Sequence, residues 1–119
     1  MKCMIALLLA AATSSAFALD CKNAVSTPDM NECASIEQKE VEAKLNKVYQ
    51  RVTKSIDEAS TRKALVEAQR AWVKFREADC KAVYEQNKTG TIRTLMFIGC
   101  MQQHAETRTK ALEEFNSGG

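Results

Sequence analysis

Apolar residues recur at the three- and four-residue spacing of an α-helix along three stretches of the chain. These residues are Val41, Leu45, Val48, Val52 and Ile56 in the first stretch, Leu65, Ala68, Trp72, Phe75, Ala82 and Val83 in the second, and Leu95, Ile98, Met101, Ala105, Leu112 and Phe115 in the third. One face of each predicted helix is therefore apolar, as in helices that pack around a shared core. The four glycines and one proline are too few for the many turns of a β-sandwich.

Residues that start and stop helices bound these stretches. Thr27, Pro28 and Asp29 supply a capping hydroxyl, a proline suited to the first turn and an acid at the positive end of the helix dipole. The apolar pattern then breaks at residues 57–61 and again at residues 87–91. Because breaks this short join antiparallel neighbours, the sequence predicts an all-α fold, an antiparallel three-helix bundle.

Folding the chain back at each break brings apolar residues opposite apolar residues. The first turn sets Leu45 against Trp72, and the second sets Phe75 against Ala105, with no shift of register. This agreement is the main sequence argument for the bundle. It also makes Trp72 and Phe75 the expected aromatic anchors of the core.

Arg76 and Asp79 flank this aromatic stripe and lie one helical turn apart. A half-buried arginine–carboxylate pair can hold a bundle in one arrangement, and we expect that structural role here. The catalytic alternative is a hydrolase that uses Asp79, but acid–base hydrolysis needs a second carboxyl group in the same cleft. The single histidine of the chain argues against most histidine-based catalytic triads, and we expect no enzymatic activity.

Residues 1–18 have the three parts of an export signal. Lys2 supplies the positive start, residues 4–12 the apolar run, and residues 16–18 the small-x-small cleavage site. The apolar run is shorter than the roughly 20 residues that span a bilayer. We therefore expect cleavage after residue 18, which leaves a domain over residues 19–119 that is periplasmic or secreted. The alternative is that the apolar run forms a buried N-terminal helix of the fold.

Four cysteines remain after this cleavage, namely Cys21, Cys33, Cys80 and Cys100. An even number of cysteines in a small exported domain predicts two disulfides. Cys80 and Cys100 lie at equal distances on either side of Gly90, which favours a bond between them and leaves Cys21 for Cys33. The pairing Cys33–Cys80 stays open, because sequence alone does not fix connectivity. The long, unequal gaps between the cysteines argue against a metal site, and we expect no metal and no cofactor.

The charge balance excludes one class of partner. Lysine and arginine number 17 and the acidic residues 15, so the chain is close to neutral. Nucleic-acid binding depends on many contacts from lysine and arginine to phosphate, and this balance argues against it. No segment after residue 18 is apolar over a length that would span a membrane. The oligomeric state has no signature in the sequence.

Two segments of the chain resemble the lysozyme inhibitor LprI-like domain family, long listed as a domain of unknown function. The first runs Asp20-Cys21-x-Asn23-Ala24 and then Ser26-Thr27-Pro28-Asp29-Met30-Asn31-Glu32-Cys33-Ala34, and the second runs Ala68-Gln69-Arg70-Ala71-Trp72-Val73-Lys74-Phe75-Arg76-Glu77-Ala78-Asp79-Cys80. The resemblance implies an exported, disulfide-containing helical domain, with lysozyme inhibition in part of the family. A fold carries over between relatives more securely than an activity does.

For function, the resemblance implies a binding protein that inhibits a lysozyme. Because the cleft of a lysozyme holds catalytic carboxylates, an inhibitor gains by presenting a cation to it. Lys88 and Arg93 flank an exposed turn that also carries Ile92, and we expect these two cations to contact the partner. The alternative is a non-inhibitory module of the cell envelope that binds a peptide, a wall fragment or another protein.

Overall fold

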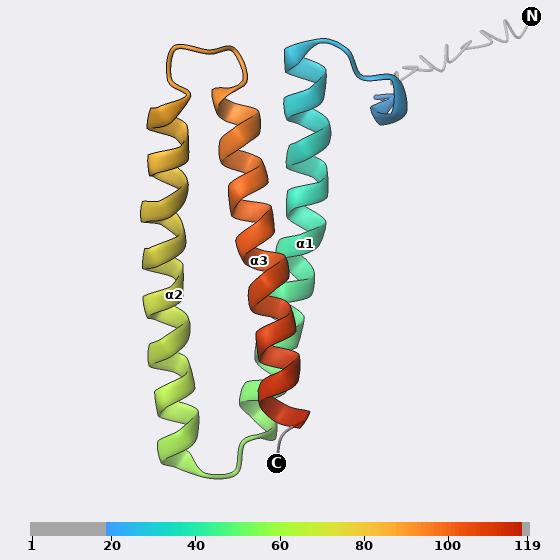
Figure 1. Ribbon diagram of the computed structural model, residues 1–119. Helices are drawn as coiled ribbons and strands as arrows, with labels where there is room; N and C mark the ends of the chain where they lie inside the picture. Colours follow the sequence, from blue (N-terminus) through green and yellow to red (C-terminus); the bar gives the residue numbers. More distant parts are fainter. Residues whose placement is uncertain (1–18, 118–119) are drawn as a thin grey trace, which may run out of the picture.

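The computed structural model describes residues 19–117, which form three long helices and no strand (Figure 1). A short 3-10 helix, η1 (Cys21–Asn23), precedes α1 (Thr27–Ser55), α2 (Ala59–Gln86) and α3 (Arg93–Ser117). The prediction of an all-α, three-helix fold is confirmed. The predicted export signal lies outside the described residues. Within residues 19–117, no helix is long and apolar enough to cross a membrane.

The third helix lies between the other two (Figure 1). α1 and α3 run in the same direction, and α2 runs antiparallel to both. α3 contacts both neighbours along much of its length, whereas the backbones of α1 and α2 approach each other closely at few points. The direct packing of α1 on α2 that the first hairpin predicts is therefore a minor part of the fold, and α3 supplies most of the surface that covers α1.

The start of α1 is capped one residue earlier than predicted. The hydroxyl of Ser26, not that of Thr27, accepts a hydrogen bond from the backbone N–H of Asp29 at 3.2 Å. Ser26 has the extended backbone that a capping residue needs, while Thr27 already belongs to the helix. Pro28 lies in the first turn, where its missing N–H costs no hydrogen bond.

The turn between α1 and α2 is held by a single arginine. The guanidinium of Arg62 donates two hydrogen bonds to the carbonyl of Ile56, at 2.9 and 3.2 Å, and one to the carbonyl of Asp57 at 3.3 Å. These carbonyls follow the end of α1, where the backbone has no helical partner of its own. Arg62 thereby ties the beginning of α2 to the end of α1.

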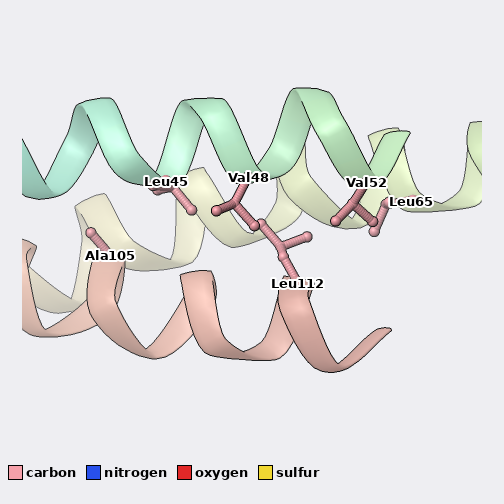
Figure 2. Packing of buried hydrophobic residues seen from close by; sticks show 6 residues of the cluster. All are labelled: Leu45, Val48, Val52, Leu65, Ala105 and Leu112. Atoms are coloured by element: carbon pink, nitrogen blue, oxygen red, sulfur yellow. The ribbon is translucent and has the colours of Figure 1, made fainter. Parts of the chain in front are cut away.

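The core occupies the half of the bundle nearer this turn and draws on all three helices (Figure 2). Its buried residues are Leu45, Val48 and Val52 of α1, Leu65 of α2, and Ala105 and Leu112 of α3. In Figure 2 the side chain of Leu112 points towards Val48. Trp72 is half-buried against this cluster, as expected of a core residue.

Phe75 does not belong to the core, and its prediction as an anchor is wrong. Its side chain is 61% exposed. The inward stripe of α2 instead passes through Leu65, Trp72, Arg76 and Cys80, at steps of seven, four and four residues. Phe75 precedes Arg76 by one position, which rotates it about 100° away from that stripe. α3 covers one side of α2 only, so this position stays open to solvent.

Both predicted disulfides form. Cys21 is bonded to Cys33 and Cys80 to Cys100, with the Cα atoms 5.6 Å apart in each pair. The first bond fastens η1 to the beginning of α1, and the second joins α2 to α3. Cys80 is fully buried. The alternative pairing of Cys33 with Cys80 is excluded.

Candidate functional site

Both disulfides lie towards the same end of the bundle. This end, which we call the disulfide-bearing end, consists of η1, the first turns of α1 and α3, the last turns of α2 and the turn over residues 87–92 (upper part of Figure 1). Because α1 and α3 are parallel, their N-termini lie side by side there. The core cluster of Figure 2 is centred farther along the helices.

Four of the exposed large apolar side chains of the described residues belong to this end, while Val73, Phe75 and Phe115 are exposed elsewhere. Val25 is 88% exposed, Ile36 and Ile92 are each 45% exposed, and Met96 is 42% exposed. Val25 precedes α1 and Ile36 belongs to α1, whereas Ile92 precedes α3 and Met96 belongs to α3. Exposed apolar side chains at one end make that end a candidate site for contact with other molecules.

Two open hollows flank the first turns of α3. The hollow on the α2 side has a volume of about 550 Å³ and is lined by Asp79, Val83, Leu95, Met96, Gly99, Cys100, Gln103, His104 and Thr107. The hollow on the α1 side has a volume of about 480 Å³ and includes Cys21, Cys33 and Ile36 in its lining. Leu95 lines both hollows, so α3 forms a ridge between two depressions.

The two predicted contact residues, Lys88 and Arg93, are held differently by the fold. The side chain of Lys88 is 65% exposed, and its Nζ lies 3.6 Å from a carboxylate oxygen of Glu85, a surface pair of little energetic value. Arg93 is half-buried. Its Nε donates to the hydroxyl of Tyr84 at 3.2 Å, and its Nη1 donates to the carbonyl of Gly90 at 3.0 Å. Arg93 thus braces the turn, and Lys88 is the exposed cation beside it.

Arg76 forms its ion pair with Glu42 of α1, and not with Asp79 as the sequence suggests. It also donates a hydrogen bond to the carbonyl of Met101 at 2.7 Å, and its guanidinium carbon lies 5.2 Å from the centre of the Trp72 ring. Burial lowers the pKa of Arg76, and the nearby carboxylate of Glu77 opposes this change. Arg76 lies on the inward stripe of α2, from which it reaches the neighbouring helices, whereas Asp79 lies outside that stripe.

Asp79 pairs instead with His104 of α3. The Nε2 atom of His104 lies 2.6 Å from Oδ2 of Asp79, and Sγ of Cys100 lies 4.0 Å from the same oxygen. The His104 ring also meets Phe75 edge to face, with the ring centres 5.6 Å apart. The sequence pattern alone did not predict this pair. The register of the hairpin around Gly90 places His104 opposite Arg76, and Asp79 lies one helical turn from Arg76, so the register was the signal that could have found the pair.

The hollow on the α2 side lacks the pair of carboxylates that glycoside hydrolysis uses. Asp79 is the one carboxylate that lines the hollow on the α2 side. A glycosidase uses two carboxyl groups on opposite sides of the bond that it cleaves.

Comparison with known proteins places the chain in a family. A family profile described as lysozyme inhibitor LprI matches residues 20–112. An uncharacterized protein of Rhizobium meliloti (strain 1021) is 30% identical over 107 residues, a match that covers 80% of this chain and 77% of the relative. No solved structure matches the chain. The matched residues include both disulfides, most of α3 and the whole of α1 and α2, so this chain belongs to the lysozyme inhibitor LprI family.

Proposed function

We propose that this protein is exported and inhibits a lysozyme, or a related muramidase, by docking its disulfide-bearing end against that enzyme. The family match over residues 20–112 is the observation that carries the inhibitory role. The exposed apolar residues at the same end supply the candidate surface. The protein acts in this account as a binding protein without catalytic activity of its own.

Rigidity supports the choice of this end. The bond between Cys21 and Cys33 holds η1 against α1, and the bond between Cys80 and Cys100 fixes α2 to α3 close to the turn over residues 87–92. A surface that is already ordered before binding loses less conformational entropy when it meets a partner. Most of the free energy gained by burying these apolar side chains is therefore available for affinity.

Lys88 supplies the charge complementarity. The cleft of a lysozyme contains catalytic carboxylates, and an exposed ammonium group fits that negative site. Arg93 supports the contact from the rim of the turn, which it holds in shape through Tyr84 and Gly90. The chain has 17 basic and 15 acidic residues, so long-range attraction contributes little and affinity depends on local contacts.

A matched pair of charge reversals tests this placement. Lys88→Glu changes the charge at the disulfide-bearing end, and Lys63→Glu makes the same change in the first turns of α2, at the opposite end. We expect Lys88→Glu to raise the inhibition constant at least about tenfold and Lys63→Glu to change it little. Equal inhibition constants for the two variants, with unchanged helical circular dichroism, would contradict the assignment of this surface.

Export is tested separately by determining the first residue of the mature chain. We expect the protein recovered from the periplasm or the culture medium to begin at Leu19, which N-terminal sequencing or the intact mass of the purified protein would show. An uncleaved chain confined to the cytoplasm would contradict export. The disulfides favour an oxidising compartment, because such bonds are rare in proteins of the reducing cytosol.

A non-inhibitory envelope module is the alternative function. The hollow of about 550 Å³ on the α2 side favours it, since a depression of this size with apolar walls and a few polar groups can hold part of a peptide or a wall fragment. Inhibition assays that stay negative, together with shifts of the His104 resonances when a wall fragment is added, would favour this function over lysozyme inhibition.

A further inference from the structure

We propose that reduction of the Cys80–Cys100 disulfide converts this part of the α2–α3 hairpin into a zinc site. The four ligands would be the sulfur atoms of both cysteines, one carboxylate oxygen of Asp79 and one imidazole nitrogen of His104. These ligand atoms already lie within 4.8 Å of one another. The inference is independent of lysozyme binding, because it concerns only the chemistry of this cluster.

The spacing of the ligand atoms suits a tetrahedral ion. Zinc binds sulfur at about 2.3 Å and nitrogen or oxygen at about 2.0–2.2 Å, which sets the ligand atoms roughly 3.3–3.8 Å apart. Here Nε2 of His104 lies 2.6 Å and Sγ of Cys100 lies 4.0 Å from Oδ2 of Asp79. Rotations of side chains cover these differences once the bond between the sulfurs is broken, so the helices need not separate.

The two helices present the ligands in complementary pairs. Asp79 and Cys80 are neighbours on α2, while Cys100 and His104 lie four residues apart on α3 and so face the same side of that helix. The core contacts of α2 and α3 lie farther along the bundle and do not depend on the disulfide. The ligands should therefore stay together after reduction.

An ion can reach this cluster from solvent. Asp79, Cys100 and His104 line the open hollow on the α2 side, while Cys80 is fully buried behind them. One buried ligand and three accessible ones would let the ion enter from the hollow. The side chain of His104 is 20% exposed, so its nitrogen would change its partner from Asp79 to the metal at little cost in desolvation.

The reaction requires a dithiol reductant, and the oxidation state of the metal does not change. The reductant gives two electrons and two protons to the disulfide, is itself oxidised to a cyclic disulfide, and leaves two protein thiols. Zn²⁺ then displaces the two thiol protons, and both cysteines bind as thiolates. Asp79 binds as a carboxylate and His104 as neutral imidazole. A metal-mediated link would thereby replace the covalent link between α2 and α3.

Cobalt absorption of a chain with two remaining cysteines tests the site. In the full chain carrying Cys3→Ser, Cys21→Ser and Cys33→Ser, Cys80 and Cys100 are the cysteines left. After reduction with a dithiol, we expect one Co²⁺ per chain, the intense visible bands of tetrahedral cobalt and a near-ultraviolet thiolate-to-cobalt band. Zn²⁺ should displace the cobalt and abolish these bands. The oxidised chain should show none of them.

Variants of the ligands and of one neighbour complete the test. Asp79→Asn and His104→Gln should each weaken cobalt binding at least about tenfold, whereas Gln103→Ala, which alters the same hollow, should leave it unchanged. If reduction lowers the helical circular dichroism, restoration of that signal by Zn²⁺ supports the site. Six-coordinate cobalt spectra, equal binding by all three variants, or a reduced chain that neither binds Co²⁺ nor regains helix with Zn²⁺ would overturn it.

Discussion

Arg76 of α2 pairs with Glu42 of α1 while it donates a hydrogen bond to the carbonyl of Met101 on α3. One guanidinium therefore contacts all three helices. Its side chain is 7% exposed and that of Glu42 is 30% exposed, so solvent screens this pair less than it screens a surface ion pair. Trp72 adds a contact between the guanidinium and its ring. We regard Arg76 as the polar residue that fixes how the helices sit together.

Replacement of Arg76 by alanine should lower the free energy of unfolding by about 2–4 kcal/mol, because it leaves the carboxylate of Glu42 half-buried and without its ion-pair partner. Arg70→Ala removes an exposed arginine from the same helix and should change stability by no more than about 0.5 kcal/mol. Urea titrations followed by circular dichroism measure both values. Similar losses for the two variants would show that the ion pair contributes nothing specific.

Leu112→Ala should destabilise the protein by about 2–5 kcal/mol, because Leu112 is 1% exposed and its truncation leaves a cavity in the core. Phe75→Ala should cost less than about 1 kcal/mol, since Phe75 is 61% exposed and loses chiefly its edge contact with His104. The comparison uses the midpoints of thermal or urea unfolding. A larger loss for the truncation of the exposed Phe75 than for that of the buried Leu112 would contradict the described packing of α2.

The two disulfides should differ in their effect on global stability. Loss of Cys80–Cys100 in the double serine variant should cost about 3 kcal/mol, because the bond closes a loop of 20 residues between two helices of the bundle. Loss of Cys21–Cys33 should cost much less, because η1 contributes no buried residue and can loosen while the helices stay folded. Denaturant titrations measure both losses, and a larger loss for the Cys21–Cys33 variant would refute this reasoning.

Acid should loosen the segment before α1. The side chain of Asn23 donates to Oδ2 of Asp20 at 2.7 Å and the backbone N–H of Lys22 donates to Oδ1 at 3.1 Å, and these bonds lower the pKa of Asp20 below 3.8. The charged carboxylate of Asp20 therefore stabilises the folded segment. Because the pKa of Asp20 is lower in the folded chain, this stabilisation is present above the unfolded pKa of about 3.9 and is lost as pH falls through the folded pKa.

A nuclear magnetic resonance titration of the Asp20 carboxyl group tests that prediction by measuring its pKa. We expect a midpoint below 3.8 in the native chain, and Asn23→Ala should raise it because the strongest donor is removed. Lys22→Ala keeps the backbone N–H and serves as the matched control, so its midpoint should stay close to that of the native chain. A native midpoint above 3.9 would contradict the hydrogen bonding described at η1.

Much of the fold could be predicted because helical periodicity and the position of one turn are local properties. The register around Gly90 correctly paired Cys80 with Cys100, and it also accounts for the edge contact between Tyr84 and Phe97. The positions of Trp72 and Leu112 in the packed interior likewise follow from periodicity. These features depend on which residues share a helix face, and a sequence carries that information directly.

The remaining features depend on how far each helix is covered by its neighbours. Periodicity placed Phe75 in the core, but α3 covers one side of α2 only and leaves that ring exposed. Pattern alone also offered Asp79 as the partner of Arg76, because Glu42 is 34 residues away and its proximity is set by tertiary packing. The position of the exposed apolar residues at one end has the same origin, since residues 25–36 and 92–96 are distant in the sequence.

The rate of cell-wall hydrolysis by lysozymes of several types, measured while the purified protein is titrated into each, tests the central claim most directly. We predict that at least one lysozyme loses most of its activity at a stoichiometric amount of inhibitor. Ile92→Asp should abolish that effect and Val73→Asp, at an exposed position in the middle of α2, should preserve it. Hydrolysis rates that stay unchanged with every type at tens of micromolar protein would contradict the proposal.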